Sequence, residues 1–154
     1  MHPDTPSIFA APIVVVEDSD EDFETLCEVA IASGVTRTIH RVASGDACLA
    51  MLRGVGDVRL AVLPALILTD LNSHGVEGRD AIVAIKTEPG LRGIPLVVLT
   101  TSANPKDVAF CYQAGANAYH VKPLRHDHYL LLLRAVMHYW LVSVTLPAAV
   151  AKGD

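Results

Sequence analysis

The sequence predicts an α/β protein in which helices cover both faces of a parallel sheet. Short apolar runs rich in β-branched residues alternate five times with segments of helical spacing, and this alternation is typical of strands joined by crossover helices. Two of the runs, "IVVV" and "LILT", are apolar or nearly so at consecutive positions. Consecutive apolar residues indicate strands that are buried on both faces, as in parallel sheets.

The apolar runs define the expected strands, which are 13–16, 38–42, 66–69, 94–99 and 117–121. The run at 38–42, "TIHRV", is the weakest of them because it is short and partly polar.

The segments between the strands carry recognisable helix ends. We expect Ser19 or Asp20 to cap the first helix and Gly34 to end it, and Ser44 and Gly54 to bound the second. Serine and aspartate side chains accept hydrogen bonds from free helix amides, and glycine adopts the left-handed conformation that ends helices. The other helices are expected to include 80–87, to run from Asn104-Pro105 to about Gly115, and to cover 126–139.

Composition and charge limit the class of protein. A chain of 154 residues, 51% hydrophobic and 19% charged, fits one folded domain. Its net charge of -5, without a long basic run, argues against nucleic acid as the main partner. The first residues have no basic start, and their apolar run is too short for a signal peptide or a membrane span. We therefore expect a cytoplasmic protein without a membrane partner.

The three cysteines, Cys27, Cys48 and Cys111, show no CxxC spacing and fall in helix-like segments. We interpret them as small buried hydrophobic side chains rather than as a redox or metal site.

Polar residues follow four of the expected strands. They are Glu17-Asp18, Asp70, Thr100-Thr101-Ser102 and Lys122-Pro123. In an open parallel sheet with right-handed crossovers, the carboxyl ends of the strands lie at one edge, and ligands bind there. We therefore expect these residues, which are distant in the sequence, to form one shallow site.

The chemistry of this set points to phosphoryl transfer. Three carboxylates in one site repel one another unless a cation neutralises them. Oxygen ligands without histidine or cysteine favour a hard ion, and Mg²⁺ is the natural choice because it combines few carboxylates with water and phosphate oxygens. The ammonium of Lys122 and the hydroxyl of Thr100 or Thr101 are donors suited to phosphate. The set predicts a phosphoryl-accepting aspartate, with Asp70 as the nucleophile.

At these separations, Glu17-Asp18, Asp70, Thr100 and Lys122-Pro123 resemble the site of the receiver domain of two-component response regulators. The resemblance covers about 13–139. It implies a flavodoxin-like (βα)5 fold, a doubly wound parallel five-stranded sheet with strand order 2-1-3-4-5. It also implies that a histidine kinase phosphorylates Asp70, and that the chain is a signalling protein rather than an enzyme, with at most self-catalysed phosphorylation and dephosphorylation.

The same resemblance implies a metal site. Mg²⁺ would be held by Asp18, Asp70 and the backbone carbonyl of Asn72, with Glu17 acting through water. Glu21 and Asp22, together with Asp20, are interpreted instead as charges that complement a helix N-terminus, without a role in metal binding.

The resemblance also implies a conformational switch. Thr100 would be the hydroxyl that moves toward the phosphoryl group, Tyr119 the aromatic rotamer switch, and Lys122 the phosphate contact. The Lys122–Pro123 peptide bond would be cis, which X-Pro bonds permit.

Two strings narrow the resemblance. "VVLTTS" and "HYWLVSVTLP" are similar to single-domain regulators of phytochrome-type histidine kinases. We therefore expect one receiver domain over 1–154, with a core of about 13–139, a C-terminal extension of about 140–154 and no output domain.

The loop after the expected acceptor departs from the family pattern. His74 stands where the family usually has proline, and Glu77-Gly78 where it often has Asp-Gly. Because proline fixes φ, its replacement should loosen this loop. We interpret His74 itself as a solvated side chain.

The last helix, "YLLLLRAVMHYWLV", is apolar nearly all round. Deep burial in the monomer is one explanation, but a second apolar face also fits a protein interface. By the family resemblance we expect a homodimer through the fourth helix, the fifth strand and the fifth helix, extended by "WLVSVTLP". The histidines of the last helix are interpreted as surface or interface residues.

Functions from other classes stay open. An aspartyl-phosphate phosphatase also uses a strand-end aspartate and Mg²⁺, but commonly has a second acid two residues later, where this chain has Asn72. The altered loop leaves room for a receiver-like interaction module that is never phosphorylated. A flavin carrier is disfavoured because no Ser/Thr-Gly-rich phosphate loop follows the first strand.

Overall fold

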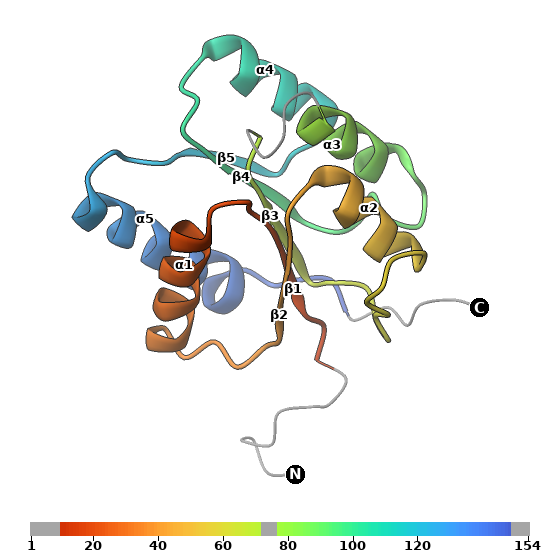
Figure 1. Cartoon of the computed structure of the whole chain (residues 1–154), viewed down its shortest axis with the longest axis horizontal. Coiled ribbons are helices and arrows are strands. Elements are labelled where there is room, and N and C mark those ends of the chain that lie inside the picture. Colours follow the sequence, from red (N-terminus) through yellow and green to blue (C-terminus); the bar gives the residue numbers. More distant parts are fainter. Residues whose placement is uncertain (1–9, 72–76, 149–154) are drawn as a thin grey trace.

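The structure is a computed structural model that describes residues 10–71 and 77–148. Within these ranges, parallel strands form a single sheet in the order β2-β1-β3-β4-β5 (Figure 1). The strands are β1 (Ile13–Val16), β2 (Ile39–Val42), β3 (Leu66–Thr69), β4 (Leu96–Thr100) and β5 (Ala118–Val121). The predicted fold class and strand order are therefore confirmed.

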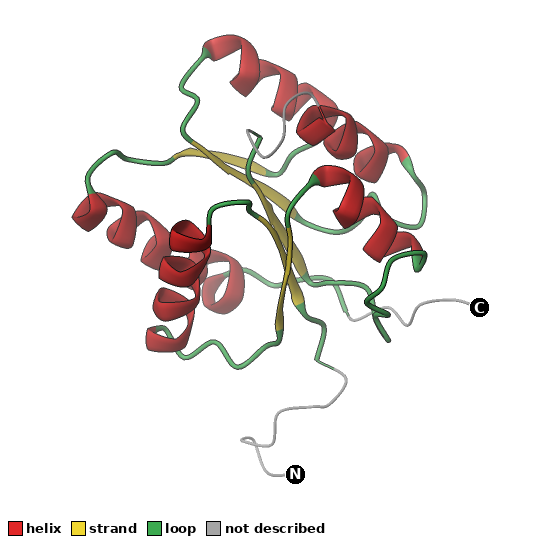
Figure 2. Cartoon of the chain, viewed as in Figure 1, coloured by secondary structure: helices red, strands yellow, loops and turns green. Residues whose placement is uncertain are grey.

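A helix follows each strand (Figure 2). The helices are α1 (Asp20–Ala32), α2 (Gly45–Arg53), α3 (Glu77–Thr87), α4 (Pro105–Ala114) and α5 (His126–His138), which continues as the π-helical turn η1 (Tyr139–Ser143). The caps are those expected, since Ser19, Ser44 and Asn104 side chains accept backbone amides of the first turns. Gly54 and Gly115 end their helices with positive φ. None of the helices in the described ranges could span a membrane.

Several boundaries differ from expectation by a few residues: β2 and β5 each begin one residue later than expected, and β4 ends one residue later. The first helix ends at a Ser33 cap, one residue before Gly34. The fourth strand begins at Leu96 rather than at 94, because Pro95 before it has no N–H to donate to a ladder. The last helix does not stop at 139 but continues into the wider π-helical turn η1, whose Trp140 is buried.

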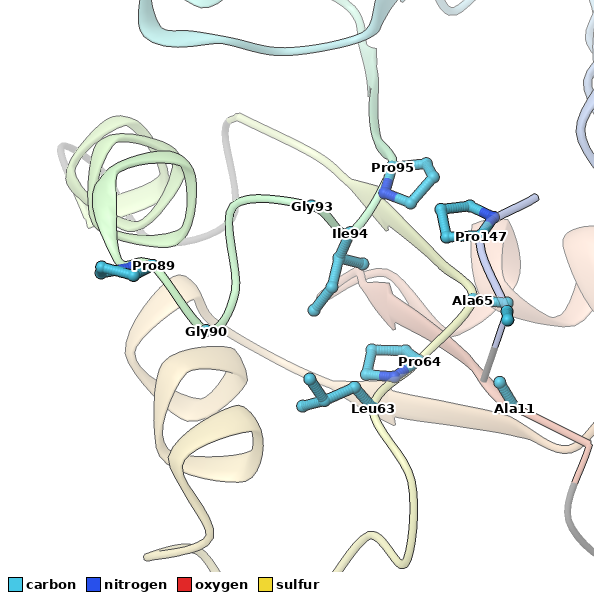
Figure 3. A pocket seen from close by; sticks show the side chains of 11 residues that line it. Ala11, Leu63, Pro64, Ala65, Pro89, Gly90, Gly93, Ile94, Pro95 and Pro147 are labelled. Atoms are coloured by element: carbon cyan, nitrogen blue, oxygen red, sulfur yellow. The ribbon is translucent and has the colours of Figure 1, made fainter. Parts of the chain in front are cut away.

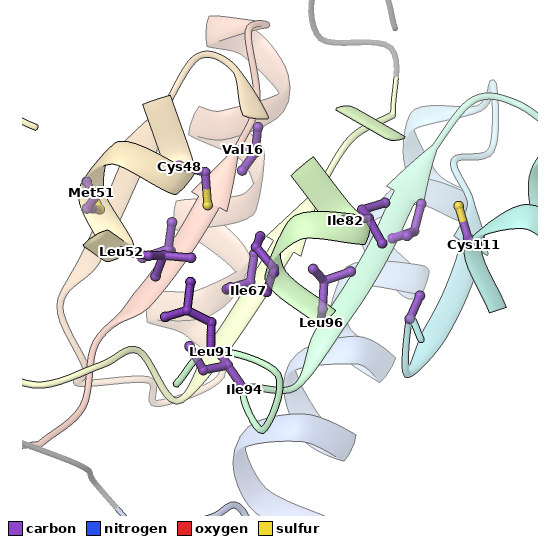
Figure 4. Close-up of a cluster of buried hydrophobic side chains, with 14 of the residues drawn as sticks. Val16, Cys48, Met51, Leu52, Ile67, Ile82, Leu91, Ile94, Leu96 and Cys111 are labelled. Atoms are coloured by element: carbon purple, nitrogen blue, oxygen red, sulfur yellow. The ribbon is translucent and has the colours of Figure 1, made fainter. Parts of the chain in front are cut away.

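The two faces of the sheet have separate cores. Side chains alternate along each strand, so Val14 and Val16 point to one face and Ile13 and Val15 to the other. The first face packs against α2, α3 and α4 (Figure 4). The second packs against α1, α5 and η1. Every residue of β1, β3 and β4 is buried, which confirms strands covered on both sides.

Two of the three cysteines are buried as expected, and Cys27 is less buried than expected. Cys48 and Cys111 are buried, Cys27 is half-buried, and all three are free thiols. Burial raises the pKa of the Cys48 thiol to about 12, so this side chain behaves as a small hydrophobic group.

The edge of the sheet at the amino ends of the strands contains an apolar cavity of about 350 Å³ (Figure 3). Pro64 and Ala65, before β3, line it together with Ile94 and Pro95, before β4. This cavity lies at the opposite edge from the polar residues that follow the strands. It is therefore not the predicted site.

Candidate functional site

The sheet register brings the predicted site residues to one edge. Val16 of β1 pairs with Thr69 of β3, so Glu17 and Asp70 each stand one residue beyond the last pair. Their residues are 5% and 8% exposed. Burial of two carboxylates at a strand edge is costly without a partner of opposite charge.

Lys122 supplies that charge. The backbone N–H of Lys122 donates to the carbonyl of Thr100 at 2.7 Å, which fixes its main chain beside the end of β4. Its ammonium lies 2.6 Å from Glu17 Oε2 and 3.0 Å from Asp70 Oδ2. A third carboxylate, Asp22 Oδ2 in the first turn of α1, lies 2.9 Å away. The Lys122 ammonium thus offsets part of the negative charge of these three carboxylates.

Burial and neighbouring charges shift the pKa values of Glu17 and Lys122. Burial raises the pKa of Glu17, and the hydrogen bond and charge of Lys122 only partly oppose that rise. Burial by itself would lower the pKa of Lys122. The hydrogen bond that Lys122 donates to Glu17, the charge of Asp70 and the contact with Asp22 outweigh it and raise that pKa well above its usual range. Lys122 therefore stays an ammonium at any physiological pH.

The loop between β1 and α1 is held from two sides. Its Ser19 amide donates to Glu17 Oε1 at 3.1 Å. Arg41 of β2 donates to the carbonyl of Glu17 at 2.8 Å and to Asp20 Oδ1 at 2.6 Å, and its guanidinium lies 5.1 Å from the ring centroid of Phe23. These contacts fix the backbone that carries Glu17, while the side chain of Asp18 is exposed.

A second polar network connects the end of β4 to three other elements. Ser102 Oγ lies 2.5 Å from Asp107 Oδ2 of α4, and Asp107 forms an ion pair with Arg79 of α3. The Tyr119 hydroxyl of β5 donates to the carbonyl of Ser102 at 2.8 Å. Thr100, fully buried, accepts the Ser102 amide at 3.4 Å. The residues after β4 thus link the predicted switch residues, Thr100 and Tyr119, to α3 and α4.

Gly78 packs directly against the residue that follows Asp70. A Cβ at Gly78 would lie 2.8 Å from the carbonyl oxygen of Leu71, closer than real side chains approach. The glycine therefore lets α3 come close to the backbone beside Asp70. The predicted metal contact of Asn72 and the interpretation of His74 lie outside the described residues.

One expectation is wrong. No peptide bond in the described part of the chain is cis, so the Lys122–Pro123 bond is trans. The trans form is favoured for X-Pro bonds by about 0.5–1 kcal/mol, and the contacts of Lys122 are made without the cis form.

The family follows from comparison with known proteins. The family model described as "Response regulator receiver domain" matches residues 13–134. The chain belongs to this family. It is a receiver domain of a two-component response regulator, and the family consists in general of signalling proteins rather than enzymes.

The relatives of this receiver include regulators of phytochrome signalling. Response regulator Rcp1 of Synechocystis sp. is 36% identical over 137 residues, which cover 89% of this chain and 93% of Rcp1. The Mn²⁺-bound form of Rcp1 superposes with a TM-score of 0.85, covering 90% of this chain and 99% of Rcp1. The phosphorylated cyanobacterial phytochrome response regulator RcpA is 33% identical, with a TM-score of 0.84 over 90% of this receiver and 99% of RcpA.

Sequence reasoning missed part of this receiver's site. The sequence predicts Asp22 only as a charge at the N-terminus of a helix, but it contacts Lys122 at a separation of 100 residues. Asp107 and Arg79 were not singled out. The signal for Asp22 is weak, because an acid in the first turn of a helix is common. Only the packing of α1 on the sheet face beside α5 brings this side chain to Lys122.

Proposed function

We propose that this receiver accepts a phosphoryl group on Asp70 from a histidine kinase. The observation that carries the proposal is the buried Asp70 carboxylate, held 3.0 Å from the Lys122 ammonium. A carboxylate oxygen forms the new bond to phosphorus while the bond from phosphorus to the kinase histidine nitrogen breaks, and the imidazole leaves. Lys122 offsets the negative charge of the phosphoryl oxygens, and Thr100, at the end of the neighbouring strand, supplies a hydroxyl.

The proposal includes a divalent cation, which we take to be Mg²⁺. Receivers bind Mg²⁺ or Mn²⁺ at their acidic site. Glu17, Asp18 and Asp70 offer only oxygen donors, which suit a hard cation, although no three His, Cys, Asp or Glu side chains of the described ranges are already grouped as metal ligands. Asp18 and Asp70, with the backbone carbonyl of Asn72 and Glu17 through water, would hold the ion. When bound, it neutralises phosphoryl charge.

The partner kinase is proposed from the relatives. RcpA is a phytochrome response regulator, and a further structural neighbour, RPA3017 of R. palustris, acts in red light signalling and is 28% identical with a TM-score of 0.77. We infer a phytochrome-type histidine kinase as the phosphoryl donor, with the exchange taking place in the cytoplasm. The receiver then acts through a protein surface rather than on nucleic acid or a membrane.

The switch would run from Asp70 through Thr100 to Tyr119. A phosphoryl group adds negative charge and strong acceptor oxygens at Asp70, and it would draw the Thr100 hydroxyl toward it. Tyr119, which bonds to the carbonyl of Ser102 two residues after Thr100, would respond to any shift of this segment. The phosphoryl group can bias the receiver only by the difference in its binding to the two states.

The responding surface is proposed to be a homodimer interface made by α4, β5, α5 and the C-terminal extension. Large apolar side chains are exposed on these elements and in the loop between β5 and α5: Tyr112 is 51% exposed, Val121 41%, Leu131 60% and, in the loop, Leu124 99%. Exposed apolar residues grouped on neighbouring elements are typical of interfaces. In sedimentation velocity, Leu131→Glu should weaken the dimer, while Val83→Glu, at an exposed site on α3, should not.

Intact mass after incubation with acetyl phosphate and Mg²⁺ tests the phosphoryl chemistry. We expect a single adduct in the wild type, and none with Asp70→Asn or with excess chelator. Asp57→Asn, at an exposed loop position, is the matched control and should form the adduct. An adduct that persists in Asp70→Asn, or a wild type that stays unmodified with acetyl phosphate and with a phosphorylated kinase, would contradict the proposal.

A further inference from the structure

We propose that Asp22 is a positioning residue of the phosphoryl site. Together with Glu17, it holds the Lys122 ammonium so that the third N–H of that ammonium points at Asp70. This inference rests on the proposed phosphorylation of Asp70, and it assigns to the first turn of α1 a part in that reaction.

The contacts of Lys122 carry the inference. An ammonium has three N–H donors, and three carboxylates surround this one, with Nζ to oxygen distances of 2.6 Å to Glu17, 2.9 Å to Asp22 and 3.0 Å to Asp70. The side chain of Lys122 is 5% exposed. The donors are therefore fully used, and the direction of each N–H is fixed by the other two.

Asp22 is the member of this trio that has no other task in the proposed reaction. Asp70 takes the phosphoryl group, and Glu17, besides its contact with Lys122, would contact the metal through water. Once Asp70 is phosphorylated, phosphoryl oxygens replace its carboxylate as the acceptor of one N–H. Asp22 then stays as the carboxylate that keeps Lys122 in place throughout the reaction.

The N-cap of α1 fixes the backbone position of Asp22. The backbone amide of Asp22 donates to the Ser19 side chain at 3.2 Å. The neighbouring acids differ: Asp20 pairs with Arg41 and its side chain is 85% exposed, and Glu21 is exposed. The side chain of Asp22 is only 36% exposed. If these acids acted only as general negative charge at the N-terminus of α1, there would be no reason for one of the three to contact Lys122.

The test separates positioning from metal binding and from helix charge. The rate of adduct formation with acetyl phosphate is measured over a range of Mg²⁺ concentrations for the wild type, Asp22→Asn, Asp22→Glu and Glu21→Gln. Asp22→Asn should lower the maximal rate about tenfold, because misplaced catalytic contacts are costly, while the Mg²⁺ concentration at half-maximal rate changes less than about threefold. Asp22→Glu should recover part of the rate. Glu21→Gln removes the same charge from the same helix turn and should match the wild type.

Several outcomes would overturn the inference. If Asp22→Asn reacts at the wild-type rate, the inference about Asp22 is wrong, but the proposed function is not affected. An equal loss in Glu21→Gln assigns the effect to helix charge, and a loss that high Mg²⁺ restores assigns it to the metal. If the wild type forms no adduct, the proposed function fails, and the inference with it. If the circular dichroism spectrum shows that Asp22→Asn is unfolded, Asp22→Ser is used in its place, and the same loss of maximal rate is expected.

Discussion

The two edges of the sheet are built from the same strands but differ in chemistry. At the amino edge, Pro12 comes directly before β1 and Pro95 directly before β4. Their carbonyls accept the amides of Ala65 and Ile67 at 2.8 Å and 2.9 Å, and the cavity between these segments is lined by residues without a charged side chain. At the carboxyl edge, buried carboxylates surround a buried ammonium. The strands are alike, so the residues immediately before and after them make the difference.

The comparison shows where each edge is sensitive. The stability of the amino edge depends on many apolar contacts and ladder hydrogen bonds, so that one substitution removes only a few of them. The carboxyl edge depends on charge balance: Lys122, Glu17 and Asp70 are each at most 10% exposed at the side chain. Removal of one member of a buried charged group leaves the others uncompensated. The largest effects of single substitutions should therefore occur at the carboxyl edge.

Removal of the ammonium should have the largest effect. We expect Lys122→Met to lower the free energy of unfolding by about 3–5 kcal/mol at pH 7, because Glu17 and Asp70 lose their buried counter-charge. Urea unfolding measures this loss. Lys106→Met, at an exposed position on α4, is the control and should change the free energy by less than about 0.5 kcal/mol.

The loss should also depend on pH. Burial raises the pKa of Glu17 above 4.5, so folding favours its protonated form and the cost of its charge disappears as pH falls through the raised pKa. The destabilisation by Lys122→Met should therefore shrink as pH is lowered from neutral toward 4.5. If Lys122→Met had the same free energy of unfolding as the wild type at neutral pH, the carboxyl edge would not be sensitive to charge balance.

The same substitution, glycine to alanine, can be made at both edges of the sheet. A Cβ at Gly78 would meet the Leu71 carbonyl at 2.8 Å, whereas a Cβ at Gly90, which lines the cavity of the amino edge, would meet nothing within 4 Å. We expect Gly78→Ala to destabilise by about 1–2 kcal/mol, since overpacking outweighs the gain in helix propensity. It should also slow phosphorylation, because Leu71 follows Asp70.

Gly90→Ala should change neither the free energy of unfolding, measured with urea, nor the phosphorylation rate by a detectable amount. Equal effects of the two alanines would show that the close approach of α3 beside Asp70 is not required.

The smallest expected effect concerns the Ser102–Asp107–Arg79 network. The hydrogen bond from Ser102 and the ion pair with Arg79 lower the pKa of Asp107. A carboxyl with a lowered pKa stabilises the fold above its unfolded pKa, and this contribution disappears as pH falls through its folded pKa. The difference in Tm between the wild type and Asp107→Asn should therefore decrease from about pH 6 to about pH 3. Asp57→Asn should show no such trend, and a constant difference for Asp107→Asn would contradict the coupling.

Much of the fold could be predicted because its signals are local. Ser44 and Gly54 bound α2 as expected, and Asn104-Pro105 begins α4, since caps act within one helical turn. The edge strand β2 was uncertain because its half-exposed positions tolerate polar residues. The extension of the last helix into η1 was not predicted, because burial of Trp140 against the α1–α5 side is a tertiary contact.

The sequence alone determined which side chains stand at the carboxyl ends of the strands, since strand length and the following residue are properties of the chain itself. It therefore identified Glu17, Asp70 and Lys122 as neighbours. Only the tertiary structure decided how their charges are balanced. The contact between Asp22 and Lys122, which are 100 positions apart, depends on how α1 packs on the face of the sheet beside α5. That packing is made by residues distant in the sequence, so local patterns do not reveal it.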